Sequence, residues 1–463
     1  MLKHMPPRFV SLNGPSLLLL TLLSGCFGNA LAAPAPVSFR AQIAPLLLEQ
    51  CQTCHGAAEQ KGGYRLDTFE FLSRNEDPSE PVLVAGKPDK SRLYTSLVTD
   101  ELDERMPKKA PKLPAQQAEL VKRWIAEGAS FDGGEPTASL IEIVPARTHP
   151  KAPEVYAQPL PVTALTFSPD GSELFAGGLR ELTVWNPATG ALVRRIGNVA
   201  PRTFTIGFTP DGQKLATASG APGEYGELRL FEPKTGALLS QLLSSTDAVL
   251  GFDFSPSGEL LATAGADHSL SIFQTASGLR LHRLPVHSDA VTAVAFSPDG
   301  TKIASVGLDR GAKVFDVATG KLAGIYREHQ APLYAVAFTP DGTQILSAGR
   351  DKALHQWNIA DGKKTRELGG QGDVLKLLVS QNQTYLAGSG GKLVQAAVAD
   401  LKLSRSLEGA HDWIYSVAIH TATQRIAAGC YDGTVTVWNL ADGKLVTSFC
   451  ASPGYSPKTA VAK

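Results

Sequence analysis

Cys51, Cys54 and His55 are the residues whose types and spacing most directly indicate chemistry. They lie in the stretch EQCQTCHGAAEQKGG, where a histidine directly follows the second of two cysteines. This spacing lets both thiols add to the vinyl groups of one haem, while the histidine on the same turn reaches the iron. A zinc site would need two more ligands, and residues 33 to 148 contain no further Cys or His. A thioredoxin-type thiol pair is the other alternative, although it would need no histidine. We therefore expect one covalent haem c, attached to Cys51 and Cys54, with His55 on the iron.

The second axial ligand of this haem is expected to be Met106. The other two methionines, Met1 and Met5, lie in an N-terminal segment that we expect to be removed. Met106 stands in the polar segment DERMP, whereas a methionine that only fills a core would have apolar neighbours. A water molecule or an open position on the iron is the alternative.

The N-terminal segment indicates export. Basic residues precede an apolar run at 17–23, which is too short to span a bilayer and is typical of a secretory signal. The segment LSGC reads as a lipobox, so that the signal would be 1–25 and Cys26 would carry the lipid. The segment ALA just before residue 33 fits ordinary cleavage instead, with a signal of 1–32. We expect a periplasmic or otherwise exported protein, anchored to a membrane if Cys26 is lipidated.

Two amphipathic stretches predict a small helical domain around the motif. Phe39, Ile43 and Leu46 share one face of a helix that leads into it, although Pro45 must kink or restart this helix. A second helix is expected from about residue 115 to 127, before Gly128.

Residues 37 to 132 resemble the planctomycete-type cytochrome c domain family. The resemblance is carried by Phe39 and the motifs IAP, CQTCHG, KGGYRLD, GKPDKS, DERMP and WIAEGA. It implies a haem c domain with the attachment and axial roles assigned above. Lys108 departs from the family, which usually has proline there. Together with Lys109 and Lys112 it predicts a basic patch near the haem edge, with a merely solvated loop as the alternative.

The second half of the chain is built from a repeat. FSPDG at 167 returns, with substitutions, as FTPDG at 208, FSPSG at 254, FSPDG at 296, FTPDG at 338, VSQNQ at 379 and IHTAT at 419. Each copy predicts four short strands joined by tight turns, which is typical of a propeller blade. Aromatic residues followed by Asn or Asp, such as Trp357-Asn358, stand where WD repeats carry their dipeptide. The repeat therefore resembles a seven-bladed WD-repeat propeller.

We predict a small all-α c-type cytochrome domain followed by an all-β seven-bladed propeller. The cytochrome domain is placed at 33–135, a proline-rich extended linker at 136–159, the propeller at 160–450 and a C-terminal tail at 451–463. Whether the linker adds a strand that closes the ring stays open.

Three blades carry histidines that recur in register with polar and aromatic partners. Because catalytic residues need not recur once per blade, we interpret these sets as structural hydrogen-bond networks. The sets are His287, Ser305 and Asp309 with Phe315; His329, Ser347, Asp351 and Trp357; and His411, Asp432 and Trp438 with Ala428 in the serine position.

Cys430 and Cys450 are expected to be free thiols. Each ends a strand, and a third strand lies between the two, so their separation should be roughly 9 to 10 Å. A disulfide needs Cα atoms closer than about 7 Å.

Composition and motifs together favour electron transfer. Lys plus Arg and Asp plus Glu both total 44, which gives no indication of nucleic-acid binding. A haem with His and Met ligands has no open position for a substrate, so we expect a one-electron carrier whose propeller docks an unidentified redox partner protein. No catalytic residues are predicted. The alternative is a redox enzyme whose propeller holds a second cofactor or metal, although the blades contain no second CxxCH and no HExxH or GxSxG motif.

Overall fold

A computed structural model describes most of the chain between Ala35 and Tyr455. Its helices and strands all belong to one compact unit, Val37–Lys463. Among the described residues, no helix is both long and apolar enough to cross a membrane. Cys26 and Lys109, on which two of the expectations rest, lie outside the described residues. These residues are 35–52, 54–56, 60–75, 77, 79–108, 111–245 and 247–455.

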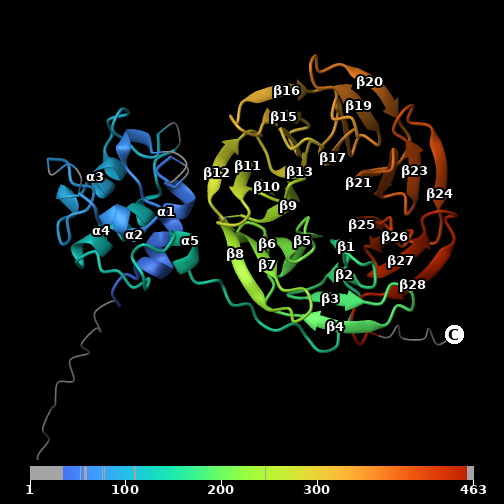
Figure 1. Cartoon of the computed structure of the whole chain (residues 1–463), viewed down its shortest axis with the longest axis horizontal. Helices are drawn as coiled ribbons and strands as arrows, with labels where there is room; N and C mark the ends of the chain where they lie inside the picture. Colours follow the sequence, from blue (N-terminus) through green and yellow to red (C-terminus); the bar gives the residue numbers. More distant parts are fainter. Residues whose placement is uncertain are drawn as a thin grey trace, which may run out of the picture. The chain divides into compact units, whose positions relative to one another are not determined.

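The region around the haem motif is small and mostly helical (Figure 1). Pro45 stands in the first turn of α1, where its missing N–H costs no helical hydrogen bond. The predicted restart of the helix at this proline is therefore confirmed, with a π-helical turn before it. The elements are η1 (Phe39–Ile43), α1 (Ala44–Gln50), η2 (Lys61–Gly63), α2 (Phe69–Ser73), η3 (Pro88–Lys90), α3 (Arg92–Val98), α4 (Ala115–Ala126) and α5 (Leu140–Ile143).

One hydrophobic core holds these helices together. Phe39 and Trp124 are fully buried in it, with ring centroids 5.3 Å apart. The indole Nε1 of Trp124 donates to the carbonyl of Ser130 at 2.9 Å, so this tryptophan has the core role that its helical spacing indicates. Leu140 and Ile143 of α5 belong to the same core, although they lie in the stretch expected to be an extended linker.

The rest of the stretch that was predicted to be a linker is extended, and hydrogen bonds hold it to the propeller. Residues 145–164 form no helix or strand. Arg195 donates to the carbonyls of Pro153 and Glu154, at 2.5 and 2.9 Å. His149 Nε2 lies 2.8 Å from Glu227 Oε1, and both side chains are buried. The exposed contacts of Arg195 and the buried contact of His149 together hold the segment along the propeller rather than leaving it a free spacer.

The described part of the chain from residue 165 onward forms seven four-stranded antiparallel sheets, which is the predicted seven-bladed propeller (Figure 1). The first four blades are β1 (Leu165–Phe167), β2 (Leu174–Gly177), β3 (Leu182–Trp185) and β4 (Leu192–Ile196); β5 (Arg202–Phe208), β6 (Leu215–Ala221), β7 (Tyr225–Phe231) and β8 (Leu238–Ser245); β9 (Val249–Phe254), β10 (Leu260–Gly265), β11 (Ser269–Gln274) and β12 (Arg280–Pro285); β13 (Val291–Phe296), β14 (Lys302–Gly307), β15 (Ala312–Asp316) and β16 (Leu322–Tyr326). The last three are β17 (Leu333–Phe338), β18 (Gln344–Gly349), β19 (Leu354–Asn358) and β20 (Lys364–Leu368); β21 (Val374–Ser380), β22 (Gln383–Gly388), β23 (Leu393–Ala397) and β24 (Leu403–Leu407); β25 (Ile414–His420), β26 (Arg425–Cys430), β27 (Thr434–Asn439) and β28 (Leu445–Cys450).

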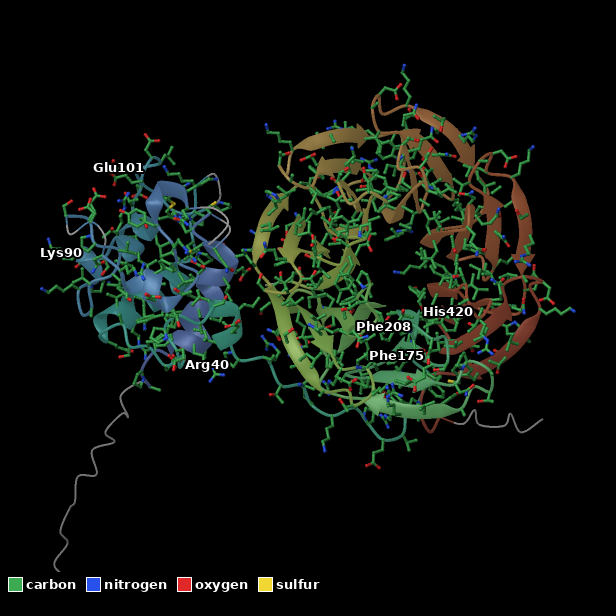
Figure 2. The ribbon with its side chains drawn as sticks, viewed as in Figure 1. Arg40, Lys90, Glu101, Phe175, Phe208 and His420 are labelled. Carbon is green, nitrogen blue, oxygen red and sulfur yellow. The ribbon has the colours of Figure 1, made fainter. Side chains whose placement is uncertain are left out.

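Burial in each blade follows from face-to-face packing of the sheets. The second and third strands lie between neighbouring blades, so both of their faces are covered and their residues are small or apolar. Phe175 of β2 and Phe208 of β5, for example, pack edge to face across two blades with centroids 5.4 Å apart (Figure 2). The first strand of each blade lies toward the centre of the ring and the fourth lies outside (Figure 1). Outer strands such as β20 are therefore mostly exposed.

The ring closes between the seventh blade and the first without a shared strand. Each sheet is made of four consecutive strands, so the linker adds none. Ser416 Oγ donates to the carbonyl of Val162 at 2.6 Å, and Val162 N donates to the carbonyl of Cys430 at 3.0 Å. His420 Nε2 bonds to the carbonyl of Pro169 at 3.0 Å (Figure 2). A hydrophobic cluster shared by the two blades completes the closure.

Candidate haem site

The end of α1 places the motif residues on one turn. Cys51 follows the last residue of this helix, and its N–H bonds to the carbonyl of Leu47 at 3.0 Å. The Cys51 carbonyl then accepts from the N–H groups of both Cys54 and His55, each at 3.1 Å. The chain therefore turns back at the motif and brings the second cysteine and the histidine beside the first.

Backbone contacts hold this turn in place. The His55 carbonyl accepts from Leu66 N at 2.6 Å, and the Cys54 carbonyl accepts from Lys61 N at 2.9 Å. A Cβ atom at Gly56 would lie 2.6 Å from the carbonyl oxygen of Gln52, so the turn has no room for a larger residue there. The motif geometry is thus set by the backbone.

Met106 reaches the same core as the motif. Its N–H donates to the carbonyl of Ser96 at the end of α3, at 2.8 Å. The side chains of Met106 and Cys51 are both partly buried and pack against the core of the helical region, as do Tyr64 and Tyr94. Two of the four proposed haem-binding residues, separated widely in sequence, therefore pack against one hydrophobic cluster.

The properties of Cys51 do not fit a redox-active thiol pair. Burial raises the pKa of its thiol to about 12, with the nearby Arg280 charge acting in the opposite direction. A redox-active cysteine has a lowered pKa and reacts as the thiolate. Cys51 and Cys54 are not joined by a disulfide.

A zinc site at the motif is not supported either. Within the described residues, the one group of three His, Cys, Asp or Glu side chains whose ligand atoms converge is His329, Asp351 and His355, in the propeller. Two thiols and one imidazole on a tight turn, with a thioether on the same apolar core, fit a covalently attached haem instead.

A buried arginine holds the end of α1 just before the motif. Arg280, at the start of β12, is 5% exposed and donates to the carbonyls of Leu48 and Glu49 at 2.8 and 2.7 Å. Burial lowers the pKa of this guanidinium to about 10. The last carbonyls of a helix carry partial negative charge and lack helical partners, so a cation there satisfies them.

Charges around Met106 are mixed. Lys112 Nζ lies 2.8 Å from Asp100 Oδ1, which removes part of the expected positive charge. Exposed acidic residues, including Glu101, stand in the same loop (Figure 2). Lys108 is exposed, whereas Lys109 lies outside the described residues. The described loop is therefore not a uniformly basic surface.

Two of the three predicted histidine sets form in the propeller. His287 Nδ1 lies 2.8 Å from Asp309, and its Nε2 lies 2.9 Å from Ser305 Oγ. In the next blade, Ser347 Oγ lies 2.8 Å from His329 Nε2 and accepts a hydrogen bond from Trp357 Nε1 at 3.1 Å. All of these groups are buried or nearly so, which fits a structural role.

The third predicted set, His411 with Asp432 and Trp438, does not form. Trp438 Nε1 donates to the carbonyl of Glu408 at 2.7 Å, and Asp432 accepts from Thr434 N. His411 is exposed. The reason lies at Ala428, which has no hydroxyl to join an imidazole to the indole.

Sequence reasoning missed a second histidine beside His329. The His355 ring stacks on the His329 ring with centroids 4.1 Å apart, and His355 Nδ1 lies within hydrogen-bond distance, 2.8 Å, of the Tyr326 hydroxyl. Burial lowers the pKa of His355 to about 4, and the neighbouring His329 acts in the same direction. Because both nitrogens of His329 and Nδ1 of His355 have protein partners, we interpret this group as part of the hydrogen-bond network. His355 lies two residues before Trp357 in β19, and this spacing, which places both side chains on one face of the strand, was the available signal.

The two C-terminal cysteines are free, as predicted. Cys430 is buried at the end of β26, and burial raises the pKa of its thiol to about 12. Cys450 is partly buried at the end of β28, and β27 lies between the two strands.

Comparison with known families agrees with these two parts. Residues 51–110 match the family described as Planctomycete cytochrome C. No curated protein matches the chain. The chain thus combines a cytochrome c-like region with a seven-bladed WD-repeat propeller, and the match to the cytochrome family supports haem binding. Matches to the family described as WD domain, G-beta repeat cover 236–274, 278–316, 320–358 and 401–439.

Proposed function

We propose that this protein is an exported one-electron carrier with a single haem c. Cys51 and Cys54 would hold the haem by thioether bonds, and His55 and Met106 would bind its iron. The observation that carries the proposal is the packing of Cys51 and Met106 against one core, with the motif turn at the end of α1. A bound haem c supplies a reversible one-electron couple.

The protein's own residues define how this couple is used. With His55 and Met106 as ligands, both axial positions are taken by side chains, so a substrate has no position on the iron. Cys51 and Met106 pack against the core that contains Phe39 and Trp124, and this core would keep water from one side of the site. Electrons would therefore leave and enter through the haem edge, by contact with a partner protein.

The propeller would select that partner. Its blades have no CxxCH, HExxH or GxSxG motif, and propellers of this repeat type commonly serve as interaction platforms. Arg280 would help to fix the haem-bearing helix relative to this platform. We further propose a periplasmic location, with Cys26 as a lipid anchor.

The visible spectrum of the purified protein tests the proposal. The reduced protein should show a c-type spectrum, and pyridine treatment should give one haem per chain. Mixing the oxidised protein with a reduced soluble cytochrome of lower potential should reduce this haem rapidly, without consumption of a small substrate. Metal analysis completes the test, because a second cofactor or metal held by the propeller would favour a redox enzyme and contradict the proposal.

A further inference from the structure

The centre of the propeller contains a cavity with a single charged side chain. The cavity has a volume of about 410 Å³ and is lined by the first strands of blades one, two, six and seven. Lys376 of β21 is the charged residue in this lining, and the others are apolar or carry a hydroxyl. Its volume exceeds that of one water molecule, roughly 30 Å³, by more than tenfold. The space can therefore hold a small organic molecule.

Lys376 is unusual for its place in the repeat. Lys376 lies three residues before Val379, which stands where most copies of the repeat have phenylalanine. In five blades, including that of Lys376, the residue at this position directly follows a register shift in the first strand. The other six blades have small residues there, so the lysine has open space before it. These residues are Ala164, Thr205, Gly251, Ala293, Ala335 and Ser416.

The ammonium group of Lys376 has no counter-charge. Among the described residues, none forms a hydrogen bond or an ion pair with it. Burial lowers the pKa of Lys376, and no partner opposes this effect. The acidic residue Asp253 of β9 is not in the cavity lining, and its carboxylate accepts from Phe296 N at 2.7 Å. Lys376 is partly buried, and a partly desolvated cation without a partner costs stability, so its presence here needs a reason.

The rest of the lining indicates what kind of anion would fit. Leu165, Ile206 and Leu378 provide apolar surface, while Ser380 and Thr421 provide hydroxyl groups near the ends of their strands. Carboxylate, imidazole and thiol groups do not occur in this lining, so it offers no set of metal ligands. An apolar body with one anionic group matches a cavity with one cation and apolar walls.

We propose that this central cavity is a binding site for a small organic carboxylate, which pairs with Lys376. The carboxylate accepts charge-assisted hydrogen bonds from the ammonium group, and its apolar body packs against the leucine and isoleucine side chains. Binding supplies the missing counter-charge and so stabilises the propeller. The site is independent of the haem and of the proposed electron-transfer role.

Benzoate is a suitable probe, with benzyl alcohol as an uncharged control of similar size. The full-length protein is labelled by reductive ¹³C-methylation of its lysines, and the Lys376 signal is identified by its absence in Lys376→Met. We expect benzoate to shift this signal saturably and to raise the melting temperature of the wild type. Lys376→Met should weaken benzoate binding by at least about tenfold, because a hydrogen bond to a charged group is lost.

Two further variants keep the test decisive. Lys376→Ala should fold, because six blades have a small residue at this position. Without benzoate, both Lys376 variants should melt no lower than the wild type, since they remove an unpaired, partly buried charge. Lys392→Met, which removes an exposed lysine of the same blade, should bind benzoate normally. Equal binding of benzyl alcohol, or no saturable effect of benzoate on the wild type, would overturn the proposal.

Discussion

Nδ1 of His329 lies 2.5 Å from Oδ2 of Asp351, inside the fifth blade. The histidine is 3% exposed, and its other nitrogen bonds to Ser347. Burial acts to raise the pKa of the Asp351 carboxyl, but the hydrogen bond from His329 and the charges of His329 and His355 together lower it. The pair therefore joins the turn that contains Asp351 to the strands of the blade. The same His, Asp and Ser contacts form at His287, where a serine is also present.

Removing the carboxylate should destabilise the propeller without affecting the haem. Asp351→Ala leaves the buried His329 imidazole without its partner, at a cost of about 1 to 3 kcal/mol. Denaturant unfolding should show this loss, while the visible spectrum and the redox potential stay unchanged. Asp432→Ala is the matched control, because the set at that position does not form. A changed potential at unchanged stability would contradict the structural role.

The folded protein should also become less stable as the pH is lowered, because of His355. The pKa of His355 is about 4 in the folded protein, below the value of roughly 6.5 for an unfolded histidine. Between these two values the unfolded chain binds a proton that the folded chain does not, so stability decreases as the pH falls from about 6.5 to about 4.

This dependence can be measured by unfolding at several pH values. The contribution of one such group is at most about 1.4 kcal/mol per pH unit. His355→Gln should make the dependence shallower, although His287, whose pKa is also lowered by burial, retains part of it. His411→Gln serves as control, since His411 is exposed. Identical pH profiles for His355→Gln and wild type would exclude His355 as the source.

Met106→Ala should change the iron ligation but not the attachment of the haem. The oxidised protein should lose the weak near-infrared absorption band that arises from the bond between the Met106 sulfur and the iron. The thioether bonds to Cys51 and Cys54 should remain. Absorbance of the oxidised protein and denaturing electrophoresis with haem staining measure the two effects. Leu102→Ala, an exposed residue of the same loop, should keep the band. If the wild type lacks this band, the assignment of Met106 is wrong.

Replacement of Cys26 tests the anchor. The wild type should fractionate with membranes, and Cys26→Ser should move to the soluble periplasmic fraction. Cys450→Ser, which changes a cysteine far from the signal, should leave the distribution as it is. A mature N-terminus at Ala33 without modification would show that the anchor does not exist.

The sequence predicts the propeller well because the repeat returns at a regular spacing along the whole propeller, although it is weaker in the last two blades. The repeat and the glycine turns lead directly to seven sheets of four strands. The fate of His411 depends instead on one missing hydroxyl at Ala428, and the stacking of His355 on His329 depends on packing between strands. Leu140 and Ile143 of α5 were missed because a helix of four residues has too little periodicity to detect. Such features depend on tertiary contacts, which no local pattern contains.

The closure of the ring without a shared strand has a consequence for how the propeller can be rebuilt. Every blade comes from one uninterrupted stretch of chain, so new termini placed between any two blades would break no sheet. Circular permutants that join the present ends by a flexible peptide should therefore retain all seven sheets. The seam at Val162 and Ser416 is held by side-chain packing and hydrogen bonds, and no chain segment continues across it from the seventh blade into the first. Under mechanical load, the ring should part at this seam first, with each blade still intact.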